Sequence, residues 1–155
     1  MNPAREIFAA SARPRETVSN YPEPFHERFR GRIKRPLAAH FGINDFGVNL
    51  TTLAPGAHSS LQHRHSHEDE FIYVLEGELT LLTETSETIL RPGVCVGFPA
   101  GGTSHHLENR SPSAATYLEI GSRNPADTVS YPQDDLFAIA NDNSWCFFRK
   151  NGDPY

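Results

Sequence analysis

Five of the eight histidines in this sequence lie in two short segments, and an acidic triplet (68–70) directly follows the first of them. Imidazole nitrogens and carboxylate oxygens are the ligands that divalent transition metals bind in proteins. Packing alone does not explain such clustering, and a metal site does. The candidate ligands are these clustered side chains: His63, His65, His67, Glu70, His105 and His106.

Strand geometry decides which of these side chains can converge. Alternate side chains of a strand point to the same face, so His63 and His65 face together and Arg64 faces the opposite way. The odd number of positions from His65 to Glu70 would put Glu70 on the opposite face if both lay on one straight strand. The polar segment 66–69 suits a turn, however, and a reversal there would bring Glu70 beside the histidines from a neighbouring strand. A shifted set that uses His67 in place of His63 has the same alternate spacing and remains an alternative.

The elements that must hold these ligands are short and strand-like. From Val48 onward, β-type runs are separated by turn residues such as Pro55-Gly56 and Gly101-Gly102. No helix of crossover length separates the runs, which disfavours a parallel βαβ architecture and indicates an all-β sandwich or barrel. The expected strands are 48–53, 71–77, 78–83, 87–90, 94–98, 105–109 and 115–120.

The two ends of the chain differ from this β-rich centre. Prolines interrupt the first part so closely that no long helix is expected there, and after Gly121 the composition is again that of a loop. One helical turn is expected at 136–140, and a last strand at 145–149 whose aromatic face serves packing. We therefore predict an N-terminal arm (1–44) that packs on the barrel or on a partner subunit, a barrel core (45–121), and a C-terminal extension (122–155) with a final strand.

Two ordered motifs resemble those of the cupin superfamily. The first has Gly56, then His63-x-His65, four residues, Glu70, six residues and Gly77; the second has Gly93, five residues, Pro99, then His105, three residues and Asn109. The resemblance implies a double-stranded β-helix (jelly-roll) barrel with the metal ligands His63, His65, Glu70 and His105 inside. It also implies turn roles for Gly56, Gly77, Gly93 and Gly101. Several further segments resemble one group of stand-alone, functionally uncharacterised bacterial cupins.

The sequence departs from the cupin pattern in two loops. Six residues separate Gly56 from His63 where five are usual, and three separate Gly101 from His105 where two are usual. Because both departures lie in loops, they affect the expected path of these loops and not the identity of the expected ligands. Adjacent side chains of a strand point to opposite faces, so only one of His105 and His106 can face the barrel interior. The motif spacing predicts that this residue is His105, and His106 then faces outward with Glu108.

The resemblance implies one divalent transition metal per chain, and the ligand types alone do not choose among Fe, Mn, Ni, Co, Cu and Zn. Open coordination positions suit an enzyme acting on a small organic molecule. An oxygenase is slightly favoured, because it needs little beyond the metal and an apolar pocket, which Ile72, Val74 and Leu107 could supply.

Two other functions remain open. A sugar or sugar-phosphate isomerase needs an acid or base, for which Glu119 and Tyr117 are weak catalytic candidates, and a phosphate site, for which Arg123 and Arg64 are candidates. An ordinary surface role is the favoured explanation of each of these residues. A non-catalytic ligand-sensing or metal-sensing cupin is the other alternative, although the first 44 residues leave no room for a DNA-binding domain.

Composition narrows the partners and the compartment. The net charge of −5 argues against a nucleic-acid binder, and the sequence has no apolar run of membrane-spanning length. A basic cluster at 28–35 is interpreted as a solvated arm or edge strand rather than an anion-steering surface. The first residues lack a signal-peptide core, so a cytoplasmic protein with reduced cysteines is expected. A small-molecule ligand and a homodimer are the expected partners.

Overall fold

The computed structural model describes residues 6–141 and 144–155. Its strands are β1 (Arg32–Pro36), β2 (Phe46–Leu53), β3 (Arg64–His65), β4 (Glu70–Glu76), β5 (Leu79–Thr83), β6 (Glu87–Leu90), β7 (Cys95–Phe98), β8 (His105–Glu108), β9 (Ala115–Ser122), β10 (Thr128–Tyr131), β11 (Leu136–Asn141) and β12 (Ser144–Phe148). Helical structure in the described ranges consists of two 3₁₀ turns, Ala9–Ser11 and His26–Phe29, and the short helix α1 (Leu37–His40). The all-β prediction is confirmed.

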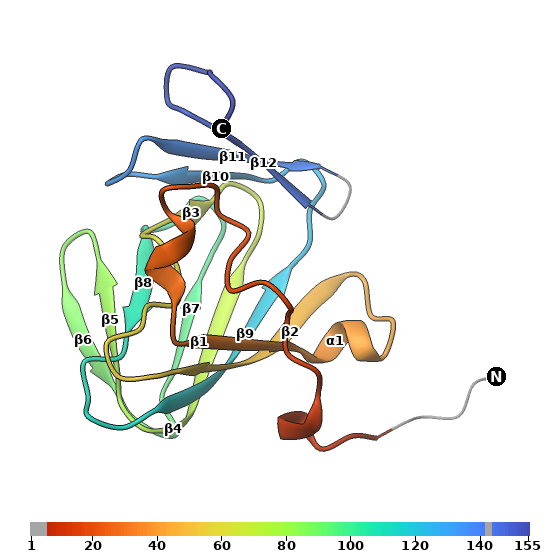
Figure 1. The fold of residues 1–155 in the computed structure, drawn as a ribbon, viewed down its shortest axis with the longest axis vertical. Helices are drawn as coiled ribbons and strands as arrows, with labels where there is room; N and C mark the ends of the chain where they lie inside the picture. The colour runs from red at the N-terminus through yellow and green to blue at the C-terminus, as the bar shows by residue number, and fades with distance from the viewer. Residues whose placement is uncertain (1–5, 142–143) are drawn as a thin grey trace.

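Two antiparallel sheets form the jelly-roll barrel. One has the strand order β1-β2-β9-β4-β7 and the other the order β6-β5-β8, and Figure 1 shows them enclosing the lower part of the molecule. Apolar side chains that point between the sheets form the main core, among them Leu53, Val74, Leu79, Leu107 and Ala115, all almost fully buried. Alternation along each strand places these residues inside and their neighbours outside.

The turn between β4 and β5 shows why glycine is needed at one motif position. Gly77 has a φ of +74°, and a Cβ at this position would lie 2.6 Å from the carbonyl oxygen of Ala114. Any other residue would clash with backbone there. The three other glycines expected in turns also adopt positive φ: Gly56, Gly93 and Gly101.

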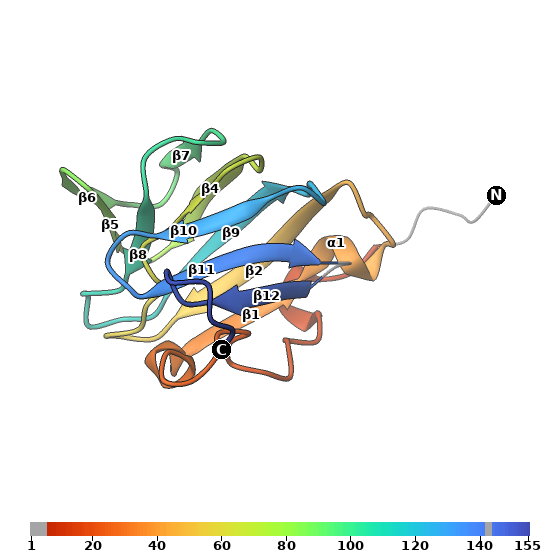
Figure 2. The same cartoon turned by 90° about the horizontal axis from the view of Figure 1, so that it is seen from above.

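A third sheet, with the order β12-β11-β10-β3, lies over one end of the barrel (Figures 1 and 2). Its edge strand β3 pairs with β10 through His65 and Val129 and through Arg64 and Ser130. The C-terminal extension therefore holds in place the segment that carries two candidate metal ligands.

The N-terminal arm packs on this C-terminal sheet. Phe25 and Phe29 are buried in a second core together with Leu61, Tyr131 and Leu136. Trp145 and Phe147 of β12 pack against the same core, as expected for an aromatic face that serves packing. The described part of the arm thus contacts its own chain.

Two local expectations need correction. The segment 136–140 is not a helical turn but part of strand β11. Leu136 and Ala138 are buried while Phe137 between them is only partly buried, and the strand pairs with β10 on one side and with β12 on the other. The supposedly irregular lead-in also contributes β1, an edge strand paired with β2 along its whole length. Cys95 and Cys146 are free thiols. Among the described helices, not one has the length and apolar character needed to span a membrane.

Candidate metal centre

Backbone pairing brings the first and last predicted ligands together. The amide of His63 donates to the carbonyl of His105 at 3.1 Å, and the amide of His105 donates back at 2.8 Å. This reciprocal pair sets the two imidazoles side by side, with ring centroids 4.9 Å apart. The extra residue in the loop before His105 therefore leaves the expected strand register intact.

The other two ligands reach the same point from neighbouring strands. His65 follows on β3, with its ring centroid 5.2 Å from that of His63. Glu70 begins β4 after the polar turn 66–69, as the predicted reversal requires. The Glu70 carboxylate lies 3.3 Å from Nε2 of His63, 3.8 Å from Nε2 of His65 and 3.1 Å from Nε2 of His105.

Each imidazole is oriented through its other nitrogen. Nδ1 of His63 lies 2.9 Å from the carbonyl of Leu61, and Nδ1 of His105 lies 3.4 Å from the carbonyl of Thr103. A carbonyl oxygen only accepts hydrogen bonds, so Nδ1 carries a proton in both rings, and Nε2 points at the Glu70 carboxylate, to which it can donate a proton of its own. A metal would bind through Nε2 in place of that proton.

The third imidazole is held by a carboxylate that sequence reasoning missed. Nδ1 of His65 lies 2.5 Å from Oδ2 of Asp127, which is completely buried. The other carboxylate oxygen of Asp127 accepts hydrogen bonds from the amide of His67 at 2.7 Å and from Oγ of Ser66 at 3.1 Å. Asp127 reaches His65 through the pairing of β10 with β3, and its position in the sequence carries no spacing signal for this contact.

The ring of His105 is fixed on its face as well. The aromatic ring of Phe98 stacks on it with centroids 3.4 Å apart and an interplanar angle of 2°. Together with the Thr103 contact, this stacking leaves the ring little freedom to rotate.

The charges of the site suit a cation. Burial by itself raises the pKa of Glu70, but the adjacent His63, His105 and His65 outweigh it and hold the pKa of this carboxyl well below its usual range. Oε2 of Glu70 is buried and lies 3.3 Å from Nε2 of His63 and 3.1 Å from Nε2 of His105. Three imidazole nitrogens around one ionised carboxylate form a donor set that divalent transition metals bind, so the residues present fit a divalent metal.

The structure does not assemble the alternative ligand set. His67 is exposed, and its Nδ1 is bonded to Oγ of Ser66 at 2.7 Å. Donor atoms of His63, His65 and Glu70, by contrast, all lie within 4.8 Å of one another. His106 points to the other face of β8, as predicted, although it is buried there rather than open to solvent.

Comparisons with known proteins identify the fold family. The Cupin domain family matches residues 49–121. A crystal structure of a sugar phosphate isomerase from a cupin superfamily, from Silicibacter pomeroyi, is 37% identical in sequence, with a TM-score of 0.91 over 97% of this chain and 96% of that one. The chain belongs to the cupin superfamily.

Two further structures extend the comparison. A protein of Acidithiobacillus ferrooxidans provisionally named sugar phosphate isomerase is 31% identical, with a TM-score of 0.73 over 77% of each chain. A polyketide cyclase of Streptomyces resistomycificus is 19% identical with a TM-score of 0.63, over 77% of this chain and 79% of that one, and shares the fold. No curated protein matches the chain.

The candidate metal centre of this cupin opens into a cavity of about 190 Å³. Ile72 and Leu107 line this cavity as expected, whereas Val74 is fully buried in the core and does not reach it. Trp145 closes one side, with its ring centroid 5.8 Å from that of His65.

The cavity is also lined by polar and charged residues that were only weak candidates from the sequence, or were not candidates at all. Both catalytic candidates, Glu119 and Tyr117, line it, and so do Arg15, Arg32 and Lys34. Arg32 and Lys34 belong to the basic cluster interpreted as a solvated edge strand; that interpretation is incomplete, because alternation along β1 turns these two side chains inward. Neither Arg64 nor Arg123, the phosphate candidates, is among the lining residues.

Three side chains that line the cavity form a contiguous polar group. The ammonium of Lys34 pairs with Oε1 of Glu119, and the hydroxyl of Tyr117 donates to Oε2 of Glu119 at 3.4 Å. Burial, reinforced by the charge of Glu119, raises the pKa of Tyr117 well above its usual value. Burial lowers the pKa of Lys34, and the attraction of Glu119 opposes this shift.

Proposed function

We propose that this cupin is a metal-dependent isomerase that interconverts the aldose and ketose forms of a small anionic sugar, with a sugar phosphate as the substrate class. The observation that carries the proposal is the position of Glu119, whose carboxylate lines the same cavity as the three histidines and Glu70. An aldose–ketose isomerase needs this combination of a metal centre and a separate base.

The metal, when bound, would polarise the substrate carbonyl and lower the barrier to removing a proton from the adjacent carbon. Glu119 is proposed to accept that proton and to return it to the former carbonyl carbon, while the hydroxyl proton of the adjacent carbon passes to the former carbonyl oxygen, so that the new carbonyl forms on the adjacent carbon. Tyr117 donates its hydroxyl hydrogen to one oxygen of Glu119, which leaves the carboxylate oriented. The neighbouring Lys34 ammonium pairs with the other oxygen of the carboxylate.

The charged part of the cavity supports an anionic substrate. Arg15, Arg32 and Lys34 contribute three positive groups to the lining, against the carboxylates of Glu70 and Glu119. Guanidinium groups bind phosphate oxygens through paired N–H donors. Arg32 already donates through Nη1 to the carbonyl of Ser59 and through Nη2 to that of Val18 at 2.7 Å, so Arg15 is the proposed phosphate ligand and Arg32 adds positive charge beside it.

The comparisons support the same reaction class. The structure that covers nearly the whole chain at 37% identity is named a sugar phosphate isomerase. An oxygenase, which the sequence slightly favoured, has no use for the Lys34–Glu119 pair or for the arginines beside it, so the composition of the cavity favours the isomerase.

The test is turnover by the metal-loaded protein with a panel of aldoses, ketoses and their phosphates in D2O, followed by NMR. Product formation with exchange of the transferred hydrogen for deuterium is expected with at least one phosphorylated sugar. Glu119→Gln should lower kcat by about 10²- to 10⁴-fold, the usual contribution of general acid–base catalysis. The exposed Glu76→Gln should leave kcat unchanged.

Two results would overturn the proposal. One is the absence of both turnover and deuterium exchange across the panel with each of the six candidate metals. The other is full activity of Glu119→Gln on a sugar substrate, which would assign the proton transfer to another group.

A further inference from the structure

The outward face of β8 carries a second cluster of metal-binding side chains. His105 and Leu107 face the barrel cavity, so the alternation of the strand turns His106 and Glu108 to the opposite face. The segment 57–59 runs antiparallel beside this strand, with His58 directly across from Glu108. Two flanking hydrogen bonds fix that register, from Ser59 N to Leu107 O at 2.8 Å and from Asn109 N to Ala57 O at 2.9 Å.

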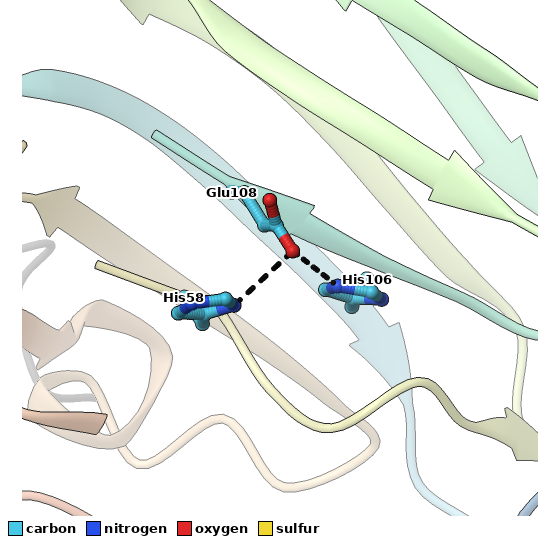
Figure 3. A group of neighbouring side chains, drawn as sticks. All are labelled: His58, His106 and Glu108. Atoms are coloured by element: carbon cyan, nitrogen blue, oxygen red, sulfur yellow. Dashed lines mark hydrogen bonds and ion pairs between the residues drawn. The ribbon is translucent and has the colours of Figure 1, made fainter. Parts of the chain in front are cut away.

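The donor atoms of this cluster converge on one point. Oε1 of Glu108 lies 3.4 Å from Nδ1 of His58 and 3.1 Å from Nε2 of His106, and Figure 3 shows the carboxylate directed at both imidazoles. One donor atom from each residue lies within 4.8 Å of the other two. A tetrahedral ion with ligand bonds of about 2.0–2.1 Å separates neighbouring donors by about 3.3 Å, which matches both of these contacts.

The carboxylate is held in this orientation by its other oxygen. Nε of Arg110 donates to Oε2 of Glu108 at 2.6 Å, and Nη1 of Arg110 donates to Glu87 at 2.8 Å. Oε2 is therefore engaged, and Oε1 is left to face the histidines. Metal-binding carboxylates are commonly oriented by such outer contacts.

The cluster is accessible from solvent through a cavity that is not the one above the metal centre. His58, His106 and Glu108 line an open depression of about 1040 Å³. The side chain of His58 is 42% exposed, whereas those of His106 and Glu108 are 10% and 18% exposed. An ion could therefore enter past His58 and keep a water ligand on its solvent side.

We infer that His58, His106 and Glu108 form a second binding site for a divalent transition metal of the Zn²⁺ type, with water completing a tetrahedral shell. Two imidazoles and one carboxylate with an open position is an established zinc ligand set. Occupancy ties the segment 57–59 to the strand whose inner face carries His105, so the second ion stabilises the wall of the first centre. The inference does not depend on the proposed isomerase function.

Titration with Zn²⁺ alone tests the inference, with the bound metal per chain measured by equilibrium dialysis and elemental analysis. The wild-type chain should bind two equivalents. His58→Ala and Glu108→Gln should each bind one, and the matched control His40→Ala, an exposed histidine elsewhere, should still bind two. His63→Ala/His65→Ala, which removes two ligands of the first centre, should keep one equivalent at the second site.

Tetrahedral coordination gives a second readout. Co²⁺ bound to His63→Ala/His65→Ala should show the intense visible absorption of a tetrahedral ion, and the further change His58→Ala should abolish it. His58 is well exposed, so its removal is expected to leave the fold intact, which circular dichroism checks. A His63→Ala/His65→Ala variant that binds no Zn²⁺, or a His58→Ala variant that binds as many equivalents as the wild type, would overturn the inference and leave a His–Glu–His hydrogen-bonded cluster in its place.

Discussion

Replacing Asp127 with asparagine isolates the contact that orients His65. Asp127 receives hydrogen bonds through both oxygens, from Nδ1 of His65 at 2.5 Å and from the amide of His67 at 2.7 Å. An asparagine side chain has one acceptor oxygen and one donor nitrogen. It can therefore satisfy only one of these two N–H groups, and its own NH₂ must face the other.

Both orientations of the asparagine weaken the metal centre. If the NH₂ faces His65, the proton of that imidazole moves to Nε2 and removes the lone pair that binds the metal. If the oxygen faces His65, the NH₂ opposes the buried amide of His67 and the turn that leads to Glu70 is strained. Loss of such an outer contact typically costs about 10- to 100-fold in metal affinity, or about 1.4–2.7 kcal/mol.

The assay is competition between the protein and a chelator for Mn²⁺, with apo-protein stability measured alongside by thermal unfolding. Asp153→Asn, an exposed aspartate near the C-terminus, is the matched control and should bind as the wild type does. The reasoning is refuted if folded Asp127→Asn binds Mn²⁺ within about twofold of the wild type, because the orientation of His65 would then not matter to the centre.

Three other predictions concern neighbouring features. His105→Ala should abolish metal binding at the Glu70 centre, whereas His106→Ala should leave it within about tenfold; the reverse result in chelator competition would mean that the register of β8 is wrong. Two copies of the chain should form a homodimer, since Tyr73 and Leu75 are each 39% exposed on the outer face of β4. A molar mass of one chain, measured by light scattering at all concentrations, would contradict this. Burial raises the pKa of Tyr21 to about 12 and raises the pKa values of Tyr117 and Tyr131 well above the usual value. In the unfolded chain these hydroxyls ionise near pH 10, whereas in the folded chain they stay protonated at that pH. The free energy of unfolding should therefore fall as the pH rises above about 10. Tyr117→Phe should shift alkaline unfolding to higher pH, and an unchanged midpoint in a phenolate absorbance titration would count against that assignment.

Features that rest on local spacing could be predicted from the sequence. The alternation of His63 and His65, the reversal before Glu70 and the parity of His105 and His106 follow from strand geometry and from turn residues a few positions away. The resemblance to the cupin motifs added the distant His105 to this set, and its backbone bridge to His63 brings it to the other three ligands. The ends of the expected barrel strands lie within two residues of the observed ones, which is the range over which strand ends fray.

Features that rest on long-range pairing could not be predicted in this way. Asp127 reaches His65 only because β10 pairs with β3, and Lys34 reaches Glu119 because β1 and β9 both pair with β2. The segment 136–140 is too short for its apolar pattern to separate a helical turn from a strand, and its partners on both sides decide the outcome. His58 likewise joins His106 and Glu108 because its loop forms a bridge with the distant strand β8.

The central claim is that one divalent metal is bound by His63, His65, Glu70 and His105, and anomalous X-ray diffraction from Mn²⁺-loaded crystals tests it most directly. The account predicts an anomalous peak about 2.0–2.3 Å from Nε2 of all three histidines and from the Glu70 carboxylate. No peak between these four side chains in crystals of the loaded protein, or a peak that excludes any one of them, would contradict it.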